Sequence, residues 1–358
     1  MKKFNLFLLM TLTALAGCQP KPGTEDLIRL HNSGIAAAFS SYGARLVQLE
    51  VAGKDRQPVN IVWGFDSADS YKRAAKDPYY GAIIGRYGNR IAKAQFTLDG
   101  NIYHLNANDH RNSLHGGKDG FNSKTWDIVA KSDSSVTFSY TSPDGEGGYP
   151  GKLAVKVTYT LSSDRSLHIV YEAKTDKPTV INLTNHAYWN LNGPGSGDIL
   201  KHKLTIYAAR YLPVDSTLIP LGKAAPVMGT PFDFNRPTAI GARINIANEQ
   251  LKSGKGYDHN YVLDAHDKQM PVAEVTGDRS GISMQVYTDQ PGLQFYSGNF
   301  MAGNNVMNGG HGDNFRNGFC LETQHFPDSP NEPAFPSPVL RPGETYRTTT
   351  VYRFTAGR

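Results

Sequence analysis

Cysteine is nearly absent from this chain of 358 residues, which contains only Cys18 and Cys320. If Cys18 is modified, as argued below, Cys320 stands alone, and neither a disulfide framework nor a zinc site built from cysteines can form. Three motifs that carry chemistry in many enzymes are also missing: the Gly-x-Ser-x-Gly turn of α/β-hydrolases, the phosphate-binding loop and the His-Glu-x-x-His zinc motif. The sequence gives no support to these classes of enzyme.

The chain also lacks a strong charge of either sign. Its 37 Lys and Arg residues against 32 Asp and Glu residues give a net charge of +5 at pH 7, and the positive residues are scattered rather than clustered. Because nucleic acids are bound by clustered basic residues, no nucleic-acid partner is expected.

A short apolar run lies near the N-terminus, where Lys2 and Lys3 precede residues 4–17. A positive start followed by apolar and then small residues is typical of a secretory signal peptide, and the run is too short for a transmembrane span. The tetrapeptide Leu-Ala-Gly-Cys that ends at Cys18 also resembles the bacterial lipobox, in which the cysteine is lipidated after cleavage. We therefore expect residues 1–17 to be a lipoprotein-type signal peptide and Cys18 to be lipidated. An ordinary signal peptide with an incidental cysteine is the alternative.

Gln19 follows this cysteine, at the position where Asp is associated with retention in the inner membrane. In a Gram-negative cell this favours an exported protein that is lipid-anchored at the outer membrane and faces the periplasm or the cell surface. Residues 18–25 are polar and contain two prolines and a glycine, which is typical of a tether. Contact with a membrane is expected only through the lipid, and residues 26–358 are expected to form a single domain.

Apolar and polar residues alternate along much of the remaining chain, with the period of two that a half-buried β-strand produces. In residues 153–161, Leu, Val and Tyr alternate with Ala, Lys and Thr, and residues 167–173 repeat the pattern. Turn-forming pairs such as Asp99-Gly100 separate these segments, and 36 glycines and 21 prolines suit many short strands. The best helical window is residues 244–254. The sequence thus predicts an all-β fold, a large antiparallel β-sandwich with few short helices.

The segment VINLTNHAYWNL, residues 180–191, combines a strand-like pattern with chemically active groups. Read as a strand, it places Leu183 and Trp189 on an apolar face, and His186 and Tyr188 on the opposite face together with amides and a threonine. The question is what such a polar face holds, if not water.

Other polar residues interrupt strand-like or glycine-rich segments elsewhere. They are Arg86, Asn89, Arg90, His115, Asp258, Gln294 and Glu322. Each has a structural explanation when taken alone, since a strand histidine is usually hydrogen-bonded within the fold and a strand glutamate usually faces solvent. Together, amides, an arginine, histidines and carboxylates are groups that bind sugar hydroxyls, while aromatic rings cover the C–H faces of a sugar. His186 and Glu322 also form a possible acid–base pair, which suits proton transfer without a cofactor.

These segments, in their order and spacing, resemble the aldose 1-epimerase family, also called galactose mutarotases. The resemblance covers nearly the whole chain after the tether and is carried by SSYGARLVQLEV, GRYGNRIAKAQFTLDG, NSLHGGKDGF, SPDGEGGYPG, LTNHAYWNL, YLPVDSTLIPLG, GYDHNYVL, QPGLQFYSGNF and GFCLETQHFPDSPN. Departures are small: Gly88 stands where the family often has alanine, and Trp189 where phenylalanine is usual. Because Trp189 falls on the apolar face, this change is expected to adjust packing rather than chemistry.

The resemblance implies a fold, a reaction and a set of roles. The fold is the large β-sandwich of the galactose mutarotases, with residues 26–358 as one catalytic domain. The reaction is interconversion of the α and β anomers of a free aldose, of the D-galactose or D-glucose class, through acid–base catalysed ring opening and closure. His186 is the implied acid at the ring oxygen, and Glu322 is the implied base at the C1 hydroxyl. The implied substrate-binding residues are Asn89, Arg90, His115, Tyr188, Asp258 and Gln294.

Protonation states affect these implied roles. Unperturbed pKa values of about 4.3 for glutamate and about 6.5 for histidine leave Glu322 ionised and His186 mostly neutral at pH 7. For His186 to act as an acid, its pKa must rise, and we expect negative charge from Glu322 or Asp258 to raise it.

Three other functions use many of the same groups. A glycoside hydrolase would use Asp258 and Glu322 as its two carboxylates, a non-catalytic sugar-binding lipoprotein would share the fold, and a hexose-6-phosphate epimerase would need an extra basic cluster that is not evident. No cofactor and no metal site are expected, and a structural Ca²⁺ is compatible with the sequence but has no readable ligand pattern. The expected partner is a monosaccharide, and the expected state is a monomer or a weak dimer.

Overall fold

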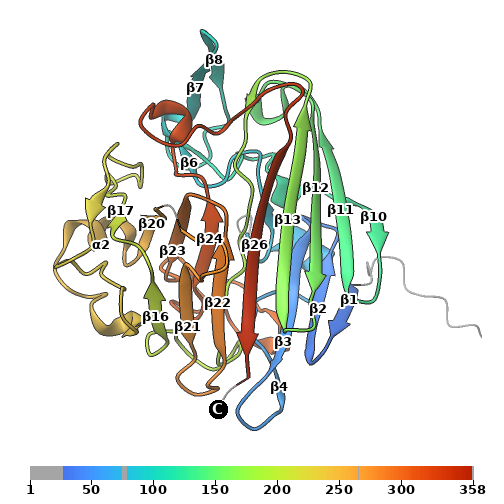
Figure 1. Ribbon diagram of the computed structural model, residues 1–358, viewed down its shortest axis with the longest axis vertical. Helices are drawn as coiled ribbons and strands as arrows, with labels where there is room; N and C mark the ends of the chain where they lie inside the picture. Colours follow the sequence, from blue (N-terminus) through green and yellow to red (C-terminus); the bar gives the residue numbers. More distant parts are fainter. Residues whose placement is uncertain (1–26, 75–78, 265, 357–358) are drawn as a thin grey trace, which may run out of the picture.

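The computed structural model describes residues 27–74, 79–264 and 266–356 (Figure 1). The expected signal peptide, tether and lipidated cysteine all lie before residue 27, outside the described residues, so these predictions stay predictions. No helix among the described residues combines the length and the apolar character needed to cross a bilayer.

The alternation of apolar residues produces the strands that the sequence predicts. In β12 (Leu153–Leu161) every second side chain is buried, and β13 (Ser166–Thr175) continues the pattern with Ile169 and Tyr171. The two strands pair antiparallel near the middle of a nine-stranded sheet. In spatial order this sheet contains β10 (Asp127–Lys131), β11 (Ser135–Ser142), β12, β13, β26 (Tyr346–Thr355), β22 (Ser283–Thr288), β21 (Ala273–Thr276), β16 (Lys203–Ile206) and β19 (Thr238–Ala239).

Two smaller sheets lie behind the nine-stranded sheet in Figure 1 and form the second layer. One contains β1 (Ile28–Asn32), β2 (Ile35–Ser40), β3 (Arg45–Ala52) and β4 (Pro58–Asn60); the other contains β18 (Ala225–Pro226), β17 (Arg210–Tyr211), β20 (Asp258–Val262), β23 (Gly292–Tyr296) and β24 (Cys320–Gln324). Side chains of both layers share one apolar core, in which Phe39 packs on Tyr159 and Trp189 packs on Tyr352. The fold is therefore the predicted all-β sandwich, and Trp189 lies in its core.

Short elements complete the fold. Two-stranded pairs are formed by β5 (Ile83–Ile84) with β15 (Thr184–Asn185), β6 (Arg90–Ile91) with β9 (Ser113–Leu114), β7 (Gln95–Leu98) with β8 (Asn101–His104), and β14 (Thr179–Val180) with β25 (Val339–Leu340). The α-helices are α1 (Ala68–Arg73) and α2 (Glu249–Gly254), and 3-10 turns cover Ala92–Ala94, Phe121–Ser123, Glu146–Gly148, Ile240–Ala242, Asn308–Gly310 and Ser329–Asn331. The predicted helical window at 244–254 starts before the observed helix, which begins at Glu249. The Asn248 side chain caps α2 by accepting hydrogen bonds from the N–H groups of Gln250 and Leu251.

Residues 180–191 do not form the long strand that their alternation predicts; they contain the end of β14, the two residues of β15 and isolated bridges at Asn182 and Trp189. Buried amides bind main-chain carbonyls instead: Asn182 Nδ2 donates to the carbonyl of residue 88 at 3.0 Å, and Asn190 Nδ2 donates to that of residue 317 at 2.9 Å. These amides therefore serve the fold rather than a ligand. His186 and Tyr188 nevertheless reach one common cavity.

Candidate active site

A cavity of about 520 Å³ opens over the five-stranded sheet. Strand alternation places it on the face opposite to the core, because Phe295 and Leu321 are core residues whereas Tyr296 and Glu322 line the cavity. Its walls contain Tyr79, Asn89, Arg90, Asn108, Asp109, Leu114, His115, His186, Tyr188, Asp258, Tyr296, Phe300 and Glu322. Every sugar-site residue predicted from the sequence lines this cavity except Gln294, which lies beside it in β23.

Three neighbouring strands supply the two carboxylates and the amide of Gln294. In β23, Gln294 lies opposite Glu322 of β24, and β20 pairs with the other edge of β23 and supplies Asp258. Gln294 Nε2 donates a hydrogen bond to Asp258 Oδ1 at 2.7 Å. Glu322 Oε2 and Gln294 Oε1 are buried and accept no hydrogen bond from the described residues, so each keeps an acceptor site that the described residues do not use.

His115 is held by the antiparallel pair of β6 and β9. Asn89 and His115, which flank the paired residues, both have left-handed backbone conformations with φ of 60° and 54°, which asparagine and histidine adopt more readily than most residues. The His115 N–H donates to the carbonyl of Asn89 at 3.0 Å, and the Asn89 N–H donates to His115 Nδ1 at 3.1 Å. Because Nδ1 accepts, the neutral ring carries its proton on Nε2 and is a hydrogen-bond donor there.

His186 lies among aromatic rings. It stacks on Tyr188 with ring centres 5.0 Å apart and an interplanar angle of 19°, and on Tyr79 at 5.6 Å and 23°. His115 meets it edge-on at 5.0 Å. These contacts fix the plane of the imidazole, so that its two nitrogens face defined partners.

The two residues proposed for proton transfer meet in this cavity. His186 Nε2 and Glu322 Oε1 are 3.7 Å apart, and only 6% and 3% of the respective side chains is exposed. The pair thus comes together from separate parts of the chain and reaches solvent only through the cavity that both side chains line.

The two arginines of the GRYGNRI segment have different positions. Arg90 lines the cavity, and its Nε donates to Asp109 Oδ2 at 2.7 Å. Arg86 is buried elsewhere and donates to Ser142 Oγ at 2.8 Å and to three main-chain carbonyls. Strand alternation could not separate the two, since they are four residues apart.

Burial dominates the acid–base properties of the site. It raises the pKa of Glu322 well above the usual value, with the nearby charge of Asp258 acting in the same direction. It lowers the pKa of His186 to about 3, and the charge of Arg45 adds to this effect. It also raises the pKa of Asp258, against the charge of Arg90. The expectation that negative charge raises the pKa of His186 is therefore wrong, because desolvation outweighs the neighbouring carboxylates.

Ring nitrogens of His115 and His186 and a carboxylate oxygen of Glu322 lie within 4.8 Å of one another, which raises the question of a metal ion. Histidines that bind a metal usually donate their other N–H to an acceptor, whereas His115 Nδ1 receives a hydrogen bond from Asn89. Nε2 of the neutral His115 ring is then protonated and has no lone pair for a cation. Ca²⁺ in turn prefers six to eight oxygen ligands, and this group offers one carboxylate. The arrangement suits a hydrogen-bonded ligand better than a metal ion.

The sequence profile of the family described as Aldose 1-epimerase matches residues 26–353. The chain belongs to the aldose 1-epimerase family. It is 44% identical over 334 residues to the galactose mutarotase of Rattus norvegicus, covering 93% of this chain and 94% of that protein. It is 39% identical over 329 residues to the aldose 1-epimerase of Escherichia coli (strain K12), covering 91% and 94%.

Two solved structures resemble this aldose 1-epimerase family member along nearly its whole length. An aldose epimerase homologue from C. elegans superposes with a TM-score of 0.84 at 29% identity, covering 93% of this chain and 99% of that chain. The galactose 1-epimerase from Lactobacillus acidophilus NCFM gives a TM-score of 0.80 at 27% identity, covering 95% and 98%. These similarities agree with the predicted mutarotase-type sandwich.

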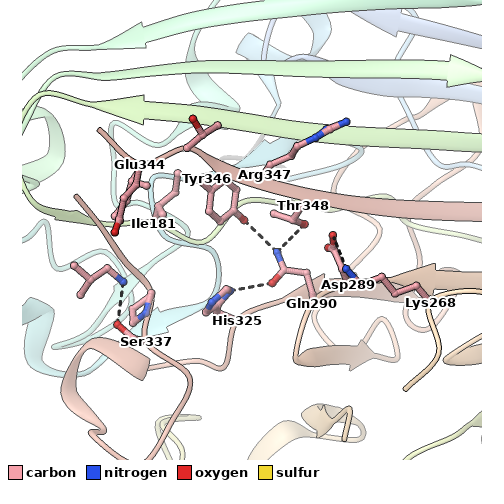
Figure 2. Close-up of a pocket in the computed structure, with 14 residues that line it drawn as sticks. Ile181, Lys268, Asp289, Gln290, His325, Ser337, Glu344, Tyr346, Arg347 and Thr348 are labelled. Carbon is pink, nitrogen blue, oxygen red and sulfur yellow. Dashed lines mark hydrogen bonds and ion pairs between the residues drawn. The ribbon is translucent and has the colours of Figure 1, made fainter. Parts of the chain in front are cut away.

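A second cavity, of about 550 Å³, lies between β25, the start of β26 and the turn at residues 289–290 (Figure 2). His325 Nδ1 donates to Gln290 Oε1 at 2.9 Å, and Gln290 Nε2 donates to the hydroxyls of Tyr346 and Thr348. Figure 2 shows this chain of hydrogen bonds across the cavity wall. Because these polar groups satisfy one another, they leave little to bind a ligand, and the first cavity is the better candidate for the active site of this family member.

Some residues of the candidate site were not found from the sequence. Tyr296 lies two residues after Gln294 on the same strand, so alternation could have found it. Phe300, which stacks on Tyr296 at 6.0 Å, and Tyr79 lie in irregular segments where no periodic signal exists. Asp109 also lies in a loop, where it lines the cavity and forms an ion pair with Arg90.

Proposed function

We propose that this protein is an aldose 1-epimerase that interconverts the α and β anomers of a free aldose of the D-galactose or D-glucose class. The observation that carries this proposal is the separation of 3.7 Å between His186 Nε2 and Glu322 Oε1 in a cavity lined by hydrogen-bonding groups. Membership of the aldose 1-epimerase family supports it.

The chemistry requires two proton transfers at one carbon. Opening the ring breaks the bond between C1 and the ring oxygen, so the ring oxygen must gain a proton while the C1 hydroxyl loses one. His186 donates the first proton and Glu322 accepts the second. The two oxygens are bonded to the same carbon, so an acid and a base that lie side by side can reach both. Rotation about the C1–C2 bond, followed by the reverse transfers, closes the ring as the other anomer.

The two protonation states of the pair correspond to the two halves of the reaction. A charged imidazole beside an ionised carboxylate is ready to open a closed ring. A neutral imidazole beside a protonated carboxyl is ready to close the open-chain aldehyde. Burial raises the pKa of Glu322 and lowers that of His186, so it favours the second state. Desolvation thereby makes both transfers of ring opening, donation by charged His186 and acceptance by ionised Glu322, more favourable than they would be in water.

The remaining groups bind and orient the sugar. His115 presents an Nε2 proton, Arg90 presents guanidinium protons, and Asp258 with Gln294 presents acceptors. Asn89 supplies a further amide at the cavity wall, and Tyr188 gives an aromatic surface for C–H groups.

Neither step requires a cofactor, and we propose that the enzyme acts without one, as a monomer or weak dimer, and with any structural Ca²⁺ outside the chemistry. We further propose that the protein is exported and lipid-anchored through Cys18 at the outer membrane. The motif at Cys18 and the glutamine that follows it support this placement.

Polarimetry of fresh α-D-galactose and α-D-glucose solutions tests the function. We expect the purified protein to accelerate mutarotation in proportion to its concentration. A rate equal to that of the uncatalysed reaction, with sugar bound, would instead support a sugar-binding protein, and release of the leaving group from an aryl glycoside would support a hydrolase. A panel that includes xylose and arabinose then ranks the substrates.

A further inference from the structure

Asp109 forms an ion pair with the arginine of the cavity wall. Its Oδ2 accepts a hydrogen bond from Arg90 Nε at 2.7 Å, and only 10% of the Arg90 side chain and 22% of the Asp109 side chain is exposed. Both residues line the candidate active site. The negative charge of Asp109 therefore lies directly against the positive charge of Arg90, in a cavity that is only partly open to water.

The backbone around Asp109 is fixed by hydrogen bonds. The N–H of Asp109 donates to the carbonyl of Asn112 at 3.1 Å, and the N–H of Asn112 donates back to the carbonyl of Asp109 at 2.8 Å. The preceding residue is held as well, because Asn108 Oδ1 accepts the N–H of Leu114 at 2.8 Å and Asn108 Nδ2 donates to its carbonyl at 3.0 Å. Leu114 lies opposite Arg90 in the pair of β6 and β9. The turn that carries Asp109 is thus anchored to the strands that carry Arg90.

The cavity walls contain more carboxylates than cations. Among the described residues that line the cavity, Arg90 is the only permanent cation. The carboxylates on these walls are Asp109, Asp258 and Glu322. His115 adds no positive charge at neutral pH, because burial lowers its pKa well below the usual value. Lys255 does not line the cavity, and its Nζ is 5.4 Å from the centre of the Phe300 ring. Since Asp109 offsets the charge of Arg90, no uncompensated cation faces a bound sugar.

From this arrangement we propose that Asp109 is a specificity-determining residue: by offsetting the charge of Arg90 it makes the site discriminate against aldoses with an acidic group, such as uronates, and admit neutral and cationic aldoses. The proposal rests on the function proposed above and narrows its substrate class. The pair of His186 and Glu322 is neutral overall while it carries one titratable proton, so it does not alter this balance.

The physical reason is the weak screening of charges inside the cavity. Two charges interact more strongly where water is partly excluded, and like charges brought together there repel each other strongly. The carboxylate of a uronate would meet the carboxylates of the walls without a free cation to bind it. An ammonium group on the sugar would meet charges of opposite sign.

Removal of the charge of Asp109 changes this balance in a defined direction. In Asp109→Asn the guanidinium of Arg90 is no longer offset. A guanidinium binds carboxylates well, because it presents several N–H groups in one plane. A uronate therefore gains a partner in this variant, whereas a cationic aldose meets an additional uncompensated cation.

The test measures kcat/KM by polarimetry at pH 6 for D-galactose, D-galacturonate and D-galactosamine. At this pH the acid at C6 of galacturonate is ionised and the amine at C2 of galactosamine is protonated. In Asp109→Asn, kcat/KM for galacturonate relative to galactose should rise at least about tenfold over the wild type, and the ratio for galactosamine should fall by a similar factor. Both changes should lie mainly in KM, because they act on binding, and added salt should reduce them.

Two variants serve as controls. Asp109→Glu keeps the negative charge and should retain the wild-type ratios. Asp99→Asn is the matched control for net charge, because Asp99 pairs with Arg341 at 2.8 Å on the exposed surface. It should leave both ratios unchanged.

Unchanged ratios in Asp109→Asn overturn the proposal, and so does an equal fall of kcat/KM for all three sugars, which would show a structural role only. The wild type itself should have a higher kcat/KM for galactosamine than for galacturonate, and the reverse order overturns the proposal even if the variant does not fold. Absence of galactose mutarotation by the wild type would refute the proposed function instead. Titration calorimetry of the three sugars with the wild type and Asp109→Asn would then still decide the charge specificity.

Discussion

At the scale of single residues, His186 and Glu322 are almost fully buried and yet line the same cavity. A buried acid or base has few water molecules to stabilise its charge, so the sugar itself becomes the main alternative proton donor or acceptor. The ordinary pKa values of the two groups in water therefore do not describe how the pair exchanges protons with the sugar. Two predictions test this at the scale of single residues.

Replacement of Glu322 by glutamine should remove the base and keep the shape of the side chain. Because an amide cannot accept the proton of the C1 hydroxyl, we expect kcat to fall by about 10²- to 10⁴-fold. Binding of galactose, measured by titration calorimetry, should change little. Glu344→Gln is the control, since Glu344 is exposed beside the second cavity. Full activity of Glu322→Gln would remove the assignment of the base.

The pH profile of kcat/KM should have an acid limb well below the ordinary pKa of histidine. His186 and Glu322 are active while they share one titratable proton between them. A second titratable proton is added only near the lowered pKa of His186, about 3. Activity should therefore be maintained from pH 7 down to about pH 5, as measured by polarimetry in buffers of constant ionic strength. A half-maximal rate near pH 6.5 would show that desolvation does not control this residue.

At the scale of elements, the pairing of β20, β23 and β24 positions Asp258, Gln294 and Glu322. Each strand contributes from the face opposite to the core, and the antiparallel register sets which residues are neighbours. Gly292 in β23 illustrates how little space this arrangement leaves. A Cβ atom at this position would lie 2.7 Å from Asn260 Oδ1 and 3.0 Å from the main-chain oxygen of Gln324.

Gly292→Ala should therefore destabilise the protein. The new methyl group must displace the Asn260 side chain or the neighbouring strand, and such overpacking costs about 1–3 kcal/mol. Urea unfolding measures the change in the free energy of unfolding. Gly254→Ala in α2 is the control, because its Cβ would make only ordinary contacts at 3.4 Å and alanine favours a helix. Equal stability of the two variants would contradict the steric argument.

Regular elements were predictable from the sequence, and irregular ones were not. The buried alternation of β12 and β13 follows directly from side chains that point to opposite faces. Residues 180–191 show an equally clear alternation, but Asn185 Oδ1 accepts the N–H of Ala187 and Asn190 Oδ1 accepts the N–H of Asn192, so these backbone groups are not free for a strand ladder. Periodicity describes burial and cannot reveal that a polar side chain competes for the backbone.

At the scale of the whole molecule, several histidines are buried in the neutral form. Outside the active site, burial lowers the pKa of His259 to about 3 and the pKa values of His202 and His325 to about 4. In the unfolded chain each would have its ordinary pKa of about 6.5. Below pH 6.5 the unfolded state therefore binds more protons than the folded state, and stability falls as the pH falls.

We expect the free energy of unfolding to be several kcal/mol lower at pH 5 than at pH 7. Each of the three histidines contributes about 2 kcal/mol to the loss. Asp328 opposes this loss of stability. Its pKa is raised to about 6 in the folded state, so on lowering the pH the folded state binds this proton at a higher pH than the unfolded state does. Urea unfolding at both pH values measures the difference. His202→Gln should reduce by about one the number of protons that the chain takes up on unfolding near pH 5, and so make the free energy of unfolding less dependent on pH. Equal stability at the two pH values would contradict the buried neutral state.

Cell fractionation tests the proposed lipid anchor. The wild type should be found with the membranes and be released by detergent, whereas Cys18→Ala should be soluble after export. Gln19→Asp should keep the anchor and, in a Gram-negative cell, move the protein to the inner membrane. A wild type that is soluble without detergent would exclude lipidation of Cys18.

The sequence alone determined the all-β class, the family and the identity of most groups in the cavity, because strand alternation and characteristic segments are local properties of the chain. The tertiary structure decided which groups act together. It brought His186 to Glu322 across distant segments, separated Arg90 from Arg86, and placed Asp109 beside Arg90. It also reversed the expected pKa shift of His186. Proximity and desolvation arise only when the layers of the sandwich pack, and so no local pattern records them.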